Sequence, residues 1–126
     1  MASKNENIEY CKYIAEQVEA YTNGQIYNYN GEKVHESELN ESELEDAERL
    51  CLLDYLERVL DIKYILNRSR KVEDAKFMIA CNGPDIWLNT ENKSVELYWW
   101  GEYSHYSLTK EACDALREVA TDLFYC

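Results

Sequence analysis

A period-two alternation of apolar residues between Lys76 and Leu108 constrains the fold of this chain more than any other feature of its sequence. Apolar positions recur at every second residue in three successive runs, Phe77–Cys81, Ile86–Leu88 and Val95–Trp99. Each run predicts a β-strand, because alternate side chains of a strand point to opposite faces. The breaks between the runs contain Asn-Gly-Pro-Asp and a polar stretch, which are typical of turns.

Two further segments extend the predicted sheet. Asp61–Leu66 alternates in the same way, and Tyr103–Leu108 predicts a further short strand. Together these runs predict a three- or four-stranded antiparallel meander, with one buried face and one face toward solvent. The second face is unusually apolar, because it carries Met78, Trp87, Tyr98 and Trp100.

Three segments have the spacing of amphipathic helices. They cover approximately residues 4–22, 43–60 and 110–124. Ser3 with Glu6 and Ser42 with Glu45 have the spacing of capping boxes, and Thr109 suits the start of the last helix. Residues 25–35 are interpreted as a loop that can hold a small hairpin at Asn30-Gly31.

The order of these elements predicts an α+β fold, α-α-β-β-β-(β)-α, in which three helices pack on the antiparallel sheet. We expect a single domain over residues 1–126, with an acidic loop and helix entrance at 32–48. The chain has five cysteines but no CxxC pair or Cys/His cluster, which disfavours a zinc site. Buried thiols in a reducing cytoplasm are expected, and a disulfide framework is the alternative.

The charge of the chain is strongly acidic. Thirteen basic and 25 acidic residues give a net charge of −12, which argues against direct binding of nucleic acid or of an anionic membrane. No signal peptide or apolar run of membrane length is present, so we expect a cytoplasmic protein. The acid residues concentrate in one segment, as Glu32, Glu36, Glu38, Glu41, Glu43, Glu45, Asp46 and Glu48. This segment is interpreted either as a solvated helix start or as a surface that binds a basic partner.

The aromatic residues suggest a second surface. With helices on one face of the sheet only, Trp87, Tyr98 and Trp100 form an exposed patch, which predicts an interface or a homodimer. Alternatively, a helix or the 25–40 loop covers that face.

No residue pattern indicates an enzyme. The two histidines are His35 and His105, and a thiol of Cys81 or Cys113 beside His105 would form a cysteine-dependent site. Cys81 lies in an alternating apolar run, however, which favours a core position. The glycines are isolated, so no phosphate-binding loop is predicted. We expect no catalytic residues, metal or cofactor.

Several segments resemble proteins of mobile genetic elements. They are ACNGPDIWLNT at 80–90, VELYWWG at 95–101, LDYL at 53–56 and LDIKY at 60–64. Over about the last two-thirds of its length the chain resembles a group of small acidic proteins encoded on phages and conjugative elements of gut Firmicutes. That group has no assigned activity, so the resemblance implies a setting and no functional residues. Small acidic proteins in that setting are often inhibitors of host defence, including DNA mimics similar to anti-CRISPR and antirestriction proteins.

The leading hypothesis is a non-enzymatic inhibitor that binds a basic protein surface, such as that of a nucleic-acid-binding nuclease. Its carboxylates between Glu36 and Glu48 would take the place of phosphates. The alternative is a structural or regulatory domain that self-associates through the aromatic face of the sheet.

Overall fold

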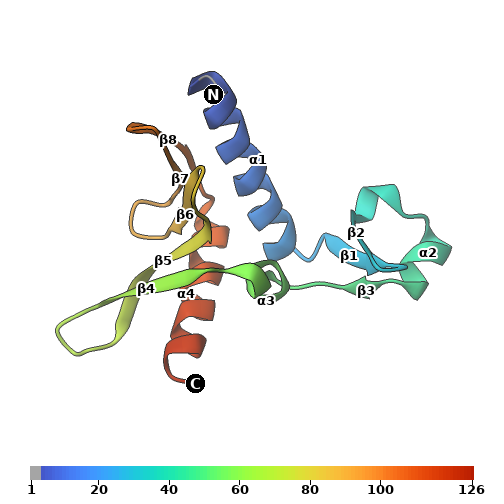
Figure 1. The fold of residues 1–126 in the computed structure, drawn as a ribbon. Helices are drawn as coiled ribbons and strands as arrows, with labels where there is room; N and C mark the ends of the chain where they lie inside the picture. The colour runs from blue at the N-terminus through green and yellow to red at the C-terminus, as the bar shows by residue number, and fades with distance from the viewer. Residues whose placement is uncertain (1–3) are drawn as a thin grey trace.

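The computed structural model describes residues 4–126 and has an α+β fold (Figure 1). Its main body combines two long helices with a five-stranded antiparallel sheet, in which each strand pairs with the next along the chain. The sheet has one or two strands more than predicted, because every alternating run forms its own strand. The bounds are α1 Lys4–Thr22, β4 Asp61–Leu66, β5 Val72–Ala80, β6 Asp85–Asn89, β7 Ser94–Trp99, β8 Glu102–Ser107 and α4 Lys110–Phe124.

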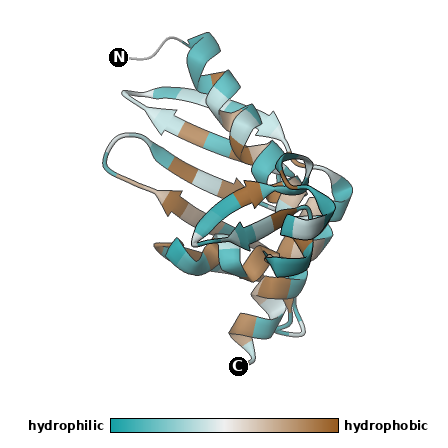
Figure 2. Cartoon of the chain, turned by 90° about the vertical axis from the view of Figure 1, so that its right-hand side faces the viewer, coloured by the Kyte–Doolittle hydropathy of each residue, from teal (hydrophilic) through white to brown (hydrophobic). Residues whose placement is uncertain are grey.

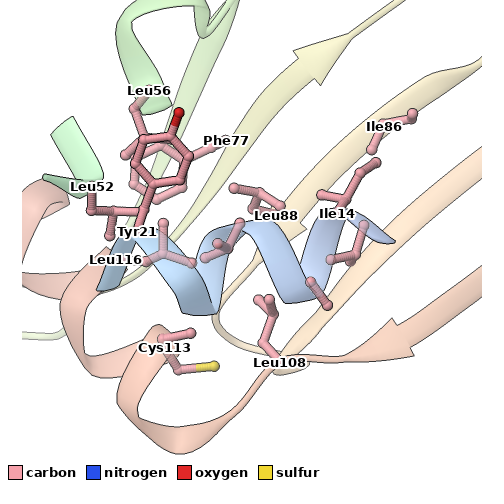
Figure 3. Close-up of a cluster of buried hydrophobic side chains, with 14 of the residues drawn as sticks. Ile14, Tyr21, Leu52, Leu56, Phe77, Ile86, Leu88, Leu108, Cys113 and Leu116 are labelled. Atoms are coloured by element: carbon pink, nitrogen blue, oxygen red, sulfur yellow. The ribbon is translucent and has the colours of Figure 1, made fainter. Parts of the chain in front are cut away.

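The hydrophobic core lies between the sheet and the two long helices (Figure 3). Phe77, Leu88 and Val95 occupy one row of the strand register and are fully buried. Val18 of α1 and Leu116 of α4 belong to the same buried cluster. Burial of these side chains supplies the main stabilisation, at about 1.5–3 kcal/mol for each large residue. The opposite side of the sheet, which we call the open face, is covered by none of the helices described in residues 4–126.

A second, smaller sheet projects from the body and is shown on the right of Figure 1. We call residues 25–50 the acidic arm. Its elements are β1 Ile26–Tyr29, β2 Glu32–His35, η1 Glu36–Glu38, α2 Glu41–Asp46 and β3 Glu48–Arg49, with strand order β2-β1-β3. At its base the backbone N–H of Leu50 donates to the carbonyl of Ile26 at 2.9 Å. Both side chains are buried in the main core, so the arm is anchored at its two ends.

The hairpin that the sequence permits at Asn30-Gly31 is present. Both residues have positive φ, 53° and 84°, as a two-residue type I′ turn requires. The Asn28 side chain accepts a hydrogen bond from the Gly31 N–H at 3.0 Å, which closes the turn.

The predicted helix over residues 43–60 is wrong. The chain forms the short helix α2, then extends into β3, and becomes helical again only in α3 Leu52–Tyr55 and η2 Leu56–Arg58. The extended segment is stabilised by pairing with β1, where Arg49 lies opposite Tyr27. The cap of α2 is Asn40 with Glu43, two residues earlier than the predicted pair.

The helix boundaries elsewhere agree with the sequence. α1 ends at Thr22 as predicted, and Thr109 caps α4 by accepting a hydrogen bond from the Ala112 N–H at 3.1 Å. The predicted cap at Ser3 lies outside the described residues. None of the helices described within residues 4–126 combines the length and the apolar character that a membrane span requires.

The cysteines are distributed differently from the prediction. Cys11 and Cys113 are buried, whereas Cys51, Cys81 and Cys126 are exposed, and all five are free thiols. The expected core position of Cys81 is wrong because β5 ends at Ala80, and Cys81 begins the turn that follows.

Candidate functional site

The acidic arm displays all seven carboxylates that the sequence suggested as a binding surface. Of these residues, Glu38, Glu41, Glu45, Asp46 and Glu48 are exposed, and Glu36 and Glu43 are partly buried. The whole arm has eight acidic residues, with Glu32, against Lys33 and Arg49, a charge of −6 out of −12 for the chain. Within the part of the chain that the structure describes, none of the eight forms a salt bridge. Figure 2 turns the arm toward the viewer, with much of it in the teal of hydrophilic residues.

Two of these carboxylates fix the backbone of the arm. Glu43 accepts a hydrogen bond from the Asn40 N–H at 3.0 Å, while Asn40 accepts one from the Glu43 N–H at 2.8 Å. Glu38 accepts from the His35 N–H at 3.3 Å in an equivalent capping box. Such caps contribute about 0.5–2 kcal/mol each and hold the short helical turns in place. The remaining carboxylates are therefore displayed on an ordered backbone.

The arginine of the arm is directed at a structural partner. Arg49 donates from Nε and Nη2 to the hydroxyl of Tyr27, at 3.0 and 2.7 Å. Its guanidinium carbon also lies 5.4 Å from the centre of the Tyr27 ring, within the range of a cation–π contact. This positive charge is held against Tyr27, and within residues 4–126 it forms no salt bridge with a carboxylate.

The open face of the sheet carries Trp87 and Tyr98, as predicted. Trp87 is partly buried and Tyr98 is 44% exposed. Lys63 Nζ lies 5.0 Å from the Trp87 ring centre, so a cation of the chain itself covers this indole. A shallow hollow of about 320 Å³ separates the two aromatic residues, and Lys76 and Glu96 also line it. The face is therefore a mixed aromatic and charged surface rather than an apolar patch.

Glu96 lies at the centre of this face and is not among the residues predicted for a site. It is only 3% exposed and accepts hydrogen bonds from Asn89 Nδ2 at 3.0 Å, Asn92 Nδ2 at 2.9 Å and the Tyr103 hydroxyl at 3.0 Å. Burial alone would raise the pKa of Glu96, but these hydrogen bonds and the nearby charge of Lys76 lower it below its ordinary value. The sequence did contain a signal for this residue, because Glu96 is a charged residue between the apolar Val95 and Leu97 inside a predicted strand.

Trp100 does not lie on the sheet face, which corrects the prediction. β7 ends at Trp99, and Trp100 and Gly101 form the turn to β8 with φ of 52° and 78°. The Trp100 side chain is 76% exposed and contacts Trp99 edge-on, with ring centres 5.6 Å apart. A tryptophan at positive φ is uncommon and strained, and such positions occur preferentially at functional sites.

The two predicted surfaces are not brought together. In Figure 1, α1 lies between the five-stranded sheet and the arm. The acidic residues and the aromatic residues therefore form two separate surfaces.

The proposed cysteine–histidine pair does not form. Cys113 is a buried residue of α4, and burial raises the pKa of its thiol. His105 stacks on Tyr103, with ring centres 5.4 Å apart, and in the described chain it has no hydrogen bond to a thiol. No group of three or more metal-ligating side chains is found among residues 4–126.

A scan against protein-family models finds no match, and searches of curated proteins and of solved structures find no match either.

Proposed function

We propose that this protein is a non-enzymatic inhibitor that binds a basic, nucleic-acid-binding protein and occupies its phosphate-binding groove. The observation that carries this proposal is the display of eight arm carboxylates with no salt bridge to any described residue. Unpaired carboxylates on a projecting, ordered element are suited to lysine and arginine side chains that normally contact phosphates. We place this activity in the cytoplasm of a bacterial host, on the basis of the resemblance to proteins of mobile elements.

The mechanism is electrostatic competition. The exposed carboxylates attract the positive groove over a range of about 10 Å at 0.1 M salt, which accelerates association. Once bound, the arm excludes nucleic acid because both ligands need the same cations. Inhibition should therefore weaken as salt rises, and duplex DNA or RNA should compete with it.

The test neutralises four exposed carboxylates that have no role in capping. The arm variant carries Glu41→Gln, Glu45→Gln, Asp46→Asn and Glu48→Gln. Glu43 is left intact because it caps α2. The matched control carries Glu9→Gln, Glu16→Gln, Glu118→Gln and Asp122→Asn, four exposed residues of α1 and α4. Both variants change the net charge from −12 to −8.

The binding of each variant is measured against a panel of purified bacterial nucleases. We expect at least one nuclease to bind the wild type and the control at low salt. The same nuclease should bind the arm variant with an affinity that is lower by a factor of about 10 or more. Equal loss in both variants would mean that only net charge matters, and would contradict a role for the arm. Absence of binding to every nuclease that contacts phosphate would also contradict the proposal.

A second candidate is self-association, which the exposure of Trp100 favours. An indole that is 76% exposed on a strained turn, beside the exposed Tyr98, is a suitable interface anchor. Sedimentation of the wild type and of Trp100→Ser distinguishes the candidates. A dimer that dissociates in this variant supports self-association, whereas a monomer at all concentrations contradicts it.

A further inference from the structure

A cavity of about 580 Å³ lies between the body and the acidic arm, on the helix side of the sheet. One wall is α1, a second is α3 and η2, and the turn between β1 and β2 supplies Gly31 and Lys33. Apolar side chains of the sheet ends, including Ile79 and Ile86, also line the cavity. Its volume is within the range of small-molecule sites, which are typically 300–1,000 Å³.

Four tyrosines surround this cavity, Tyr10, Tyr13, Tyr21 and Tyr55. Tyr21 packs edge-on against Tyr55, with ring centres 5.1 Å apart, and the Tyr21 residue is only 6% exposed. Figure 3 shows the Tyr21 hydroxyl directed away from α1 and past Leu56. No hydrogen bond joins this hydroxyl to another described residue, and it is not one of the fully shielded polar atoms without a partner, which are Asn7 Nδ2 and Ser104 Oγ. A hydroxyl can both donate and accept a hydrogen bond, so that of Tyr21 is available to a polar ligand atom in the cavity that this residue lines.

The charges at the cavity are unusual for this protein. Lys33 and Arg58 line it together with Asp54, so its lining carries a net charge of +1 in a chain with a net charge of −12. Asp54 is already engaged, because it accepts a hydrogen bond from the Cys51 N–H at 2.7 Å. Neither Lys33 nor Arg58 forms a salt bridge in the part of the chain described.

We propose that this cavity binds a small anionic ligand with a planar aromatic ring. The apolar floor and the tyrosine rings accept the ring, and the hydroxyls of Tyr21 and Tyr55 bond its polar atoms. Lys33 and Arg58 bind the anionic group, which is a phosphate or a carboxylate. Lys33 belongs to the arm and Arg58 to the body, so the ligand also links the two.

This inference is independent of the acidic surface of the arm, and its test needs no protein partner. Calorimetric titration of the whole chain uses adenosine monophosphate, benzoate, inorganic phosphate and uncharged adenosine as probes. We expect one of the two ring-bearing anions to bind at least 10-fold more tightly than adenosine or inorganic phosphate. Preference for the nucleotide identifies a phosphate ligand, and preference for benzoate identifies a carboxylate ligand.

Variants locate the binding. Lys33→Gln with Arg58→Gln should reduce the affinity at least 10-fold, and Tyr21→Phe should reduce it several-fold without disturbing the core. The matched control, Lys63→Gln with Lys76→Gln, removes the same charge from the open face and should leave binding unchanged. Binding weaker than about 1 mM for both ring anions overturns the proposal. An equal loss of affinity in the cavity variant (Lys33→Gln with Arg58→Gln) and in the control variant (Lys63→Gln with Lys76→Gln) also overturns it.

Discussion

The hydroxyl of Tyr103 donates a hydrogen bond to Oε2 of Glu96 at 3.0 Å, across two neighbouring strands of the open face. Asn89 and Asn92 donate to the same carboxylate, so a buried negative charge is satisfied from three sides. The residues of the open face therefore act together, and their protonation affects the stability of the sheet.

Glu96 should stabilise the protein at neutral pH, and this contribution should be lost in acid. Its pKa is lowered in the folded state, so its contribution is present above the ordinary value of 4.5 and is lost as the pH falls through the folded value. Glu96→Gln should cost about 1–3 kcal/mol at pH 7 and much less at pH 3. Urea unfolding of both proteins at the two pH values measures this difference. An equal cost at both would contradict the role of the charged form.

Tyrosine ionisation should reduce stability in alkali. Burial and the bond to Glu96 raise the pKa of Tyr103 to about 12, and burial raises that of Tyr55 to about 12. Because both values exceed the ordinary 10.0, their contribution is present below pH 10 and is lost as the pH rises toward 12. Absorbance at high pH should show these two residues titrating last, and the late phase should shrink in Tyr55→Phe and in Tyr103→Phe. An unchanged late phase in both variants would refute the assignment.

Thiol labelling should separate the five cysteines into two groups. Cys51, Cys81 and Cys126 are exposed and should react within minutes in the native protein. Cys11 and Cys113 are buried, and burial raises the pKa of the Cys11 thiol to about 11, so both should react only on unfolding. Mass spectrometry of labelled peptides gives the sites directly. Rapid labelling of Cys113 would show that α4 opens in the native state.

Removal of an unsatisfied polar group should stabilise the protein. Ser104 is 2% exposed, and its hydroxyl has no hydrogen-bond partner among residues 4–126. Ser104→Ala should raise the free energy of unfolding by about 1 kcal/mol, because the desolvation cost of the hydroxyl disappears. Ser107→Ala, on the exposed part of the same strand, is the control and should have little effect. A loss of stability in Ser104→Ala would indicate a bonded hydroxyl.

The turn at Trp100 should tolerate asparagine better than tryptophan. Trp100 has φ of 52°, a region that asparagine adopts more readily. The Trp100 side chain is mostly exposed, so its replacement loses little buried surface. Trp100→Asn should therefore stabilise the monomer by roughly 0.5–1 kcal/mol. Thermal unfolding at low protein concentration provides the measurement. A destabilised variant would show that the edge-on contact with Trp99 outweighs the backbone strain.

The sequence predicted the main body well because its signals are local. The alternation through Phe77, Leu88 and Val95 identifies strands whose pairing follows from short turns. The stripes of α1 and α4 and the cap at Thr109 are also local, so they locate both helices within a few residues.

The predictions that were wrong concern segments whose structure depends on residues distant in sequence. Glu48 and Arg49 continue a helical pattern, but pairing with β1 makes them extended. β7 ends at Trp99, one residue before Trp100, so the Trp100 indole lies in the turn to β8 instead of on the sheet face. The tyrosine-lined cavity depends on α1, the arm and η2 at once, so no single window of sequence contains it.

The hydrogen bond from Leu50 to Ile26 brings the two ends of the arm next to each other. The chain leaves the body and returns to it at nearly the same point, so the intervening segment behaves as an insertion. Replacement of residues 27–49 by a tight turn should leave the core intact, and the segment should be transferable to another scaffold with a similarly spaced pair of anchor residues. The arm and the folding unit are thus separable, and each can be redesigned without rebuilding the other.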